Sequence, residues 1–166
     1  MPEPAWVPAL VCLADSGNDW TVYLDVVYLM FKKDFVETTP VFEGQRLRLK
    51  RHPMKDGREA TFWHLVSEGD DERSRVPDEM RCERIRWPKA VIEKVPCTEL
   101  KRWESKRGSE TRVVIAFDDY SYVVVLAKRS GYFLPWTAYP VERKHRRAKL
   151  RKEWEEYQRK NTGAAT

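Results

Sequence analysis

Few residues in this chain are of the types that usually hold metals or form disulfides. Its 166 residues include three cysteines and three histidines: Cys12, Cys82, Cys97, His52, His64 and His145. An odd number of widely spaced cysteines fits neither a disulfide framework nor a Cys-x-x-Cys metal site, and the histidines lack metal-ligand spacing. Phosphate-binding loops, GxGxxG, His-Glu-x-x-His and nucleophile elbows are also missing. We therefore expect a protein that uses no metal and no organic cofactor.

Long apolar runs are absent as well. The longest, residues 120–127, has the length of a strand, whereas a membrane-spanning helix needs about 20 apolar residues. The first residues, Met-Pro-Glu-Pro, have no basic region like that of a signal peptide. These absences predict a cytoplasmic protein without a membrane partner.

The chain is basic, and the excess charge lies in its second half. Lys and Arg number 31 against 26 Asp and Glu, which gives a net charge of +5. Residues 1–76 have 10 basic and 13 acidic side chains, residues 77–139 have 12 and 9, and residues 140–166 have 9 and 4. A polyanion such as RNA is therefore expected to bind the C-terminal half.

The first half of the chain predicts an irregular arm, a helix, a hairpin and a second helix. Residues 1–18, with three prolines, are typical of an irregular arm. Apolar residues at helical spacing predict a helix over 19–38 with Asp19 as its N-cap. Alternation over 46–50, followed by a turn and the run 60–67, predicts a β-hairpin. A second helix is expected to start at Pro77 and Asp78 and to reach about Arg86. Pro88 then ends or kinks this helix, or begins another short turn over 89–94.

The next 40 residues have the clearest pattern. Four strand-like runs are separated by short turns, which makes consecutive strands antiparallel neighbours. The runs are residues 98–104, 111–117, 121–128 and 132–138. A charged helix over about 141–159 is expected to follow, with a flexible tail at 161–166. The sequence thus predicts one α+β domain over 19–160, with an N-terminal helix and hairpin, a helical segment, a four-stranded antiparallel meander and a C-terminal basic helix.

His64 lies in the run Phe62-Trp63-His64-Leu65-Val66. On a strand, Phe62, His64 and Val66 would share one face. A half-buried histidine that is hydrogen-bonded within a sheet is one interpretation. The other is a general acid or base, because imidazole titrates near neutral pH.

Basic side chains recur in the predicted helix and in the meander. Arg81 and Arg84 are about one helical turn apart and could hold a phosphate together, or could form a solvated face with Glu83. Lys101 and Arg112 are interleaved with aromatic residues on the strands, a pattern typical of RNA-binding sheets and also of ordinary strands with an aromatic core.

The end of the meander has two further candidate groups. Thr137 and Tyr139 share a face at the end of the last strand, where a hydroxyl and a phenol can project into a cleft. Seven of the ten residues from 143 to 152 are basic. The candidates for phosphate contacts among them are Arg143, Lys144, Arg146 and Arg147, although a solvated helix would have the same composition.

The order of these parts resembles a known group of enzymes. The FWH segment, the RCERIRW helix, the meander, its third strand YVVVLAKR and the ending WTAYPVE are similar to the metal-independent RNases of the barnase–EndoU–colicin–RelE superfamily, especially its phage-type branches. The resemblance covers about residues 60–142. The helix at 19–38 and the hairpin before His64 are additions to the minimal fold.

The resemblance implies an endoribonuclease that forms a 2′,3′-cyclic phosphate. It is compatible with a toxin whose activity a protein antitoxin restrains. It implies a catalytic set of His64, Arg84, Arg112, Thr137 and Tyr139, with Lys101 as a further RNA contact. The other candidate RNA contacts come from spacing and charge alone: Arg81, Arg143, Lys144, Arg146 and Arg147. The alternative is a noncatalytic RNA-binding or ribosome-associated module, and a third hypothesis is a regulator whose basic helix binds an acidic protein.

Overall fold

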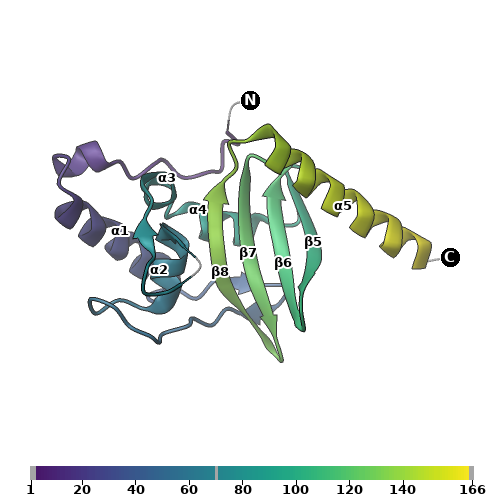
Figure 1. The fold of residues 1–166 in the computed structure, drawn as a ribbon, viewed down its shortest axis with the longest axis horizontal. Helices are drawn as coiled ribbons and strands as arrows, with labels where there is room; N and C mark the ends of the chain where they lie inside the picture. Colours follow the sequence, from purple (N-terminus) through teal and green to yellow (C-terminus); the bar gives the residue numbers. More distant parts are fainter. Residues whose placement is uncertain (1–2, 70, 165–166) are drawn as a thin grey trace.

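The computed structural model describes residues 3–69 and 71–164 and has a mixed α+β fold (Figure 1). A four-stranded antiparallel sheet has the order β5-β6-β7-β8. Its strands are β5 (Leu100–Arg107), β6 (Glu110–Phe117), β7 (Tyr122–Arg129) and β8 (Tyr132–Pro140). Helices α1 (Trp20–Phe35), α2 (Ala60–Val66), α3 (Glu79–Glu83) and α4 (Trp87–Lys94) precede the sheet, and α5 (Lys144–Ala164) follows it. The predicted fold class is confirmed.

The sheet has a hydrophobic core on each face. On one face, residues of α1, α2 and α4, including Phe31, Phe62 and Ile92, pack with Ile115 and Val124 of the sheet. The opposite face is covered in part by α5, which crosses it diagonally in Figure 1. A smaller core there joins buried sheet residues to side chains of the helix: Trp103, Val114, Ala116, Val123, Leu150, Trp154 and Tyr157. The part of this second face that α5 does not cover is called the open face of the sheet below.

The N-terminal segment follows its prediction closely. The Asp19 carboxylate accepts hydrogen bonds from the backbone N–H groups of Thr21 and Val22, as expected of an N-cap. Helix α1 ends at Phe35, a few residues early, because the Thr38 hydroxyl binds the carbonyls of the last turn. The arm is irregular apart from a 3-10 turn, η1 (Leu13–Ser16), and its Trp6 and Leu10 pack on the core.

The predicted strand over 60–67 is wrong. Residues 60–66 form helix α2, and all seven are buried. A helix enclosed on every side shows no polar face, so its sequence has no helical period to read. The preceding run is not a hairpin arm either, because the backbone of Lys50 bonds to Thr61 and Arg48 N–H donates to the Phe133 carbonyl. Before α2, β1 (Val41–Phe42) forms a hairpin with β2 (Gln45–Arg46), and a single antiparallel bridge joins Lys55 to Arg58 across the predicted turn.

The helical segment before the sheet is divided differently from the prediction. Helix α3 is short and begins at Asp78, whose carboxylate accepts from Arg81 N–H. Just before it, β3 (Ser67–Glu68) pairs with β4 (Val76–Pro77). Pro88 lies in the first turn of α4, where proline is well tolerated. Pro88 therefore lies at the start of a second helical segment, which is one of the two roles predicted for it.

All four predicted strands are present. The register contains one irregularity, between Val125 and Leu126 of β7, which pair with Thr137 and Pro135. Trp136 is thus the extra residue of a β-bulge, a feature that bends a strand and redirects side chains. The C-terminal helix continues to Ala164, so residues 161–164 are helical where a tail is predicted, and residues 165–166 lie outside the described residues.

Candidate functional site

A cleft of about 590 Å³ lies where the end of β8 meets α3 and the start of α5. We call it the Arg81 cleft. Its basic and acidic lining residues are Arg75, Arg81, Arg143, Arg146, Glu68, Asp78 and Glu142, and Thr137 and Tyr139 also line it. The cleft unites four predicted site residues from one short stretch, residues 137–146, with Arg81 of α3, which precedes Thr137 by 56 residues.

Arg81 is held from two sides at the base of this cleft. Its Nη1 donates to the Thr137 hydroxyl and to the Ser67 carbonyl, both at 3.1 Å. The guanidinium lies 5.3 Å from the centre of the Tyr139 ring, and Nη2 is 4.0 Å from Glu68 Oε1. A guanidinium fixed in this way is preorganised to bind an anion such as a phosphate.

Thr137 and Tyr139 lie on one face of β8, opposite Val125 and Val123 of β7. Both side chains are half-buried. Burial raises the pKa of Tyr139 above its ordinary value of 10.0, and the positive charges of Arg81 and Arg146 offset part of that rise. The phenol is therefore protonated at neutral pH and can donate a proton or a hydrogen bond.

Only two of the four phosphate contacts predicted at the start of α5 line the Arg81 cleft. Arg143 and Arg146 line it, whereas Lys144 is exposed at the surface and does not. Arg147 turns back, and its Nε donates to the Val141 carbonyl at 2.7 Å. Helical geometry separates these neighbours, because adjacent residues point about 100° apart around the axis.

Three other predicted residues lie elsewhere. Arg84 follows the last residue of α3, contacts the Met80 carbonyl and the Glu83 carboxylate, and does not line the Arg81 cleft. Lys101 lies under α5, with Nζ 4.5 Å from the Trp154 ring centre and 3.1 Å from the Tyr120 hydroxyl. Of the two interpretations of Arg81 and Arg84, the structure fits the second better, because Arg84 pairs with Glu83 and only Arg81 lines the cleft.

Arg112 packs against Trp136 on the open face of the sheet. Its guanidinium lies 4.1 Å from the indole centre and pairs with Glu110. The bulge that makes Trp136 an extra residue gives this contact, which sequence alternation does not predict. Trp136 also lines the Arg81 cleft. In the sequence Trp136 is one of several aromatic residues interleaved with basic ones on the strands, and that pattern does not separate it from the others.

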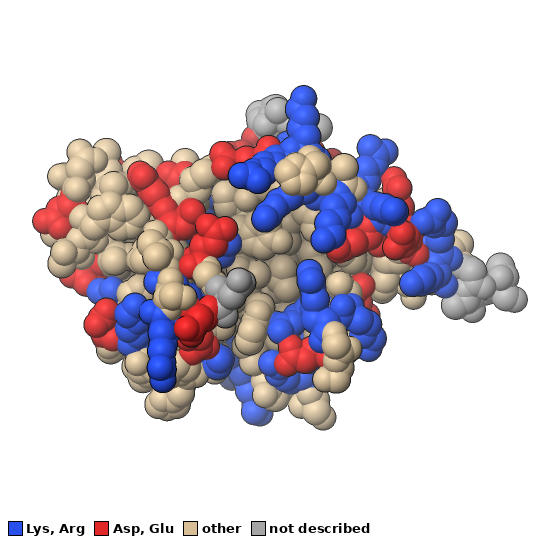
Figure 2. All heavy atoms as spheres, in the orientation of Figure 1, with Lys and Arg blue, Asp and Glu red and all other residues tan. Residues whose placement is uncertain are grey.

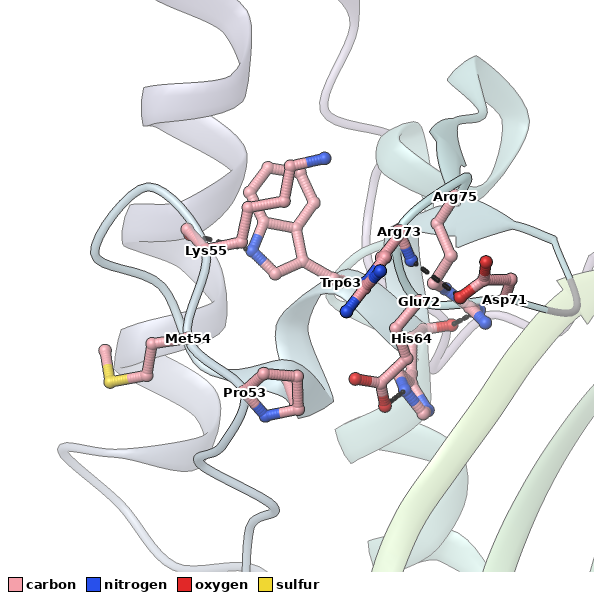
Figure 3. Close-up of a pocket in the computed structure, with 10 residues that line it drawn as sticks. Pro53, Met54, Lys55, Trp63, His64, Asp71, Glu72, Arg73 and Arg75 are labelled. Atoms are coloured by element: carbon pink, nitrogen blue, oxygen red, sulfur yellow. Dashed lines mark hydrogen bonds and ion pairs between the residues drawn. The ribbon is translucent and has the colours of Figure 1, made fainter.

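His64 lies in a separate cleft of about 690 Å³ next to β8 (Figure 3). We call it the His64 cleft, and its lining includes Pro53, Met54, Lys55, Trp63, His64, Asp71, Glu72, Arg73 and Arg75. In Figure 3 the Glu72 carboxylate points at the His64 ring, and His64 Nε2 is 3.1 Å from Glu72 Oε1. The same oxygen accepts from Lys50 Nζ at 2.8 Å. This hydrogen bond from Lys50 lowers the pKa of Glu72.

Two residues connect the clefts. Arg75 lines both, and its guanidinium donates to the carbonyls of Ser67 and Gly69. Trp136, which lines the Arg81 cleft, contacts His64 edge to face with ring centres 5.0 Å apart. His64 and the Arg81 cleft are therefore adjacent, although His64 does not line that cleft. The sequence has no signal for Arg75, which follows a charged loop.

His64 is buried, with 5% of the residue exposed. Burial lowers the pKa of His64 below its ordinary 6.5, and the hydrogen bond with Glu72 offsets only part of this effect. The imidazole is therefore neutral at pH 7, in the form that accepts a proton.

This lowered pKa predicts how stability depends on pH. Between the folded pKa and 6.5 the unfolded chain binds a proton that the folded chain does not, so the contribution of His64 is intact above pH 6.5 and is lost as the pH falls. The slope for one proton is at most about 1.4 kcal/mol per pH unit. We expect His64→Gln to flatten the loss of unfolding free energy between pH 7 and 5 in urea titrations. His52→Gln, at an exposed histidine, should leave it unchanged, and equal slopes for all three proteins would contradict the prediction.

The surface around the sheet has a consistent charge pattern. Figure 2 shows a tan hollow over the open sheet face. Mostly basic side chains lie above it near the start of α5 and below it near the turns after β5 and β7, with some acidic side chains among both groups. Residues Lys106, Arg107, Lys128 and Arg129 belong to these lower strand ends. Basic borders around a less charged floor are suited to a strand of nucleic acid.

Two further kinds of site were sought in the structure, and the chain was compared with known proteins. Among the described residues, no group of three or more His, Cys, Asp or Glu side chains is placed to hold a metal ion. No helix in the same part of the chain is both long and apolar enough to cross a membrane. No family model, no curated protein and no solved structure matches the chain.

Proposed function

We propose that this protein is an endoribonuclease that cleaves RNA without a metal ion, through a 2′,3′-cyclic phosphate. One observation carries the proposal: Thr137 and Tyr139 meet Arg81 in a cleft that Arg143 and Arg146 also line. A hydroxyl, a protonated phenol and several guanidiniums are the groups that phosphate transesterification needs when no metal takes part. The resemblance to the metal-independent RNases supports the same reaction.

In the proposed reaction the ribose 2′-oxygen attacks the adjacent phosphorus, and the bond from phosphorus to the 5′-oxygen breaks. The 2′-hydroxyl loses its proton to a base, and the departing 5′-oxygen takes one from an acid. Arg81 and Arg146 stabilise the charge that builds up on the phosphate oxygens. Tyr139 is the acid, because burial keeps its phenol protonated.

His64 is the base in this proposal. Its lowered pKa keeps the imidazole ready to accept a proton. It contacts Trp136, which lines the Arg81 cleft, whereas His52 and His145 are exposed and line neither cleft. His64 contacts Trp136 but does not itself line the Arg81 cleft. For His64 to accept the proton, the RNA must therefore extend from the Arg81 cleft to the place where the two clefts meet.

The proposal predicts cleavage of total RNA by the purified protein in excess EDTA. End-group analysis should find 2′,3′-cyclic phosphates and 5′-hydroxyls. Tyr139→Phe should lower the rate about 100-fold or more, because it removes one proton donor and keeps the ring beside Arg81. Tyr132→Phe is the matched control, since Tyr132 lies on the same strand but stacks with Arg48 outside the cleft. It should cleave like the wild type.

Other outcomes would contradict the proposal in different ways. Cleavage that disappears in EDTA would exclude the metal-independent reaction. Equal rates for Tyr139→Phe and the wild type would remove Tyr139 as the acid, and equal rates for His64→Ala would remove His64 as the base. Intact RNA that still binds in a salt-dependent way would favour the noncatalytic RNA-binding module.

An antitoxin would be a protein whose acidic side chains cover the Arg81 cleft. Four arginines line that cleft, so carboxylates could compete there with RNA phosphates. With such a partner, the enzyme would be a toxin of a toxin–antitoxin or phage system and would act in the cytoplasm.

A further inference from the structure

Helix α1 has an apolar face on each side. Tyr23, Val27 and Phe31 point inward and are fully buried. On the opposite side Val22 is 47% exposed and Leu29 is 52% exposed, and Val36, just after the helix, is 44% exposed. A helix at the surface of a monomer usually has polar residues on its outer side.

The outer apolar residues form a continuous stripe. Val22, Leu29 and Val36 follow one another at intervals of seven residues, with half-buried Val26 between the first two. Residues seven apart lie nearly above one another on a helix, and this is the spacing by which two helices pack along a seam. The stripe extends over about 21 Å at 1.5 Å per residue.

Beside the stripe, an acidic residue lies on one side of Leu29 along the helix and a basic residue lies on the other side. Asp25 lies toward the start of the helix and Lys33 toward its end, each four residues from Leu29. Both are exposed, and Asp25 also contacts Arg58. If a second α1 packs antiparallel with its Leu29 against this Leu29, each Asp25 lies opposite a Lys33, and each Val22 lies opposite a Val36. The surface is therefore complementary to itself, as a two-fold interface requires.

We propose that the outer face of α1, formed by Val22, Val26, Leu29, Lys33 and Val36, binds a second copy of this chain in an antiparallel two-fold dimer. A parallel pair would place Asp25 against Asp25 and Lys33 against Lys33, so charge selects the antiparallel arrangement. Two helices in contact over this length bury less than the roughly 1,200 Å² of a stable interface, so the dimer depends on concentration.

The dimer is independent of the proposed reaction. Figure 1 shows α1 on the side of the molecule away from α5, and no residue of the stripe lines the Arg81 cleft. Loss of RNA cleavage would leave the dimer proposal unaffected, and a monomeric protein would leave the RNase proposal unaffected.

Sedimentation velocity of the full chain over a wide concentration range tests the dimer. The wild type should rise from the 19.7 kDa monomer toward twice that mass. Leu29→Glu places two carboxylates against each other on the two-fold axis and should weaken dimerisation at least tenfold. Val76→Glu is the matched control, because Val76 is also an exposed apolar residue, 66% exposed, but lies on β4. It should dimerise like the wild type.

Cysteine cross-linking under mild oxidation tests the register. Leu29→Cys should form a disulfide dimer with itself. Val22→Cys should cross-link to Val36→Cys when the two variants are mixed, but not to itself. The wild type measures the background from Cys12 and Cys97, which are partly exposed.

Three results would overturn the proposal. A wild-type protein that stays monomeric at every concentration excludes the second copy as the occupant of this face. Self-cross-linking of Val22→Cys shows a parallel pair. A dimer that Leu29→Glu and Val76→Glu leave equally intact is formed through another surface.

Discussion

Replacing Arg81 by alanine is expected to slow RNA cleavage about 100- to 1,000-fold, the usual cost of losing one preorganised donor to a developing charge. Arg81 is the residue that links the other groups of the cleft: it donates to Thr137 and lies against the Tyr139 ring. Its loss removes the proposed phosphate contact and also the observed contacts with both neighbours. Single-turnover cleavage at saturating protein separates this rate effect from weaker RNA binding.

Arg84→Ala is the matched control for this variant. It removes the same side chain three residues further along the chain, but that guanidinium contacts the Met80 carbonyl and the Glu83 carboxylate and does not line the cleft. Arg84→Ala should therefore cleave RNA at nearly the wild-type rate. A larger loss for Arg84→Ala than for Arg81→Ala would restore the sequence-based assignment and contradict the site described above.

Arg81 also donates to the Ser67 carbonyl, so thermal unfolding must accompany the rate measurement. Arg81→Lys keeps the positive charge without the forked donor geometry. We expect it to recover part of the phosphate binding but little of the rate, since one ammonium cannot hold Thr137 and a phosphate in the same arrangement. Full activity of Arg81→Lys would show that charge alone is sufficient.

The sequence predicts the meander and α1 well because their patterns are local. Alternating residues and short turns define the strands, and Asp19 marks the start of α1. Helix α2 is different, because every residue in it is buried and its apolar pattern fits a strand equally well. The helix is specified by long-range contacts, such as those of Phe62 with Tyr28 and Phe31, which no local window contains.

In the candidate site, too, the local features can be predicted from the sequence and the long-range contacts cannot. Thr137 and Tyr139 are predictable as a pair because strand residues two apart share a face. Their meeting with Arg81 depends on how α3 packs against β8, which the sequence does not reveal. Trp136 reaches both Arg112 and His64 because of a bulge, and one extra residue in a strand is invisible to an alternation pattern.

The largest expected effect on stability is that of Phe62→Ala. Phe62 is fully buried, and its ring contacts those of Tyr28, Phe31 and Trp63. Truncation removes most of these contacts and leaves a cavity, which costs about 3–5 kcal/mol of unfolding free energy. For a chain of this size the corresponding decrease in Tm is roughly 6–20 °C. Urea and thermal unfolding measure both quantities.

Two further variants show whether the loss comes from packing around α2. Phe62→Leu keeps much of the buried volume and should lose less than half as much stability as Phe62→Ala. Trp20→Ala, at an aromatic residue that is 38% exposed, should lose less than about 1.5 kcal/mol. If Phe62→Ala cost no more than Trp20→Ala, the enclosed position of α2 would be wrong, and so would the burial that lowers the pKa of His64. The stability of this one phenylalanine variant therefore also tests the structural basis for His64 as a base.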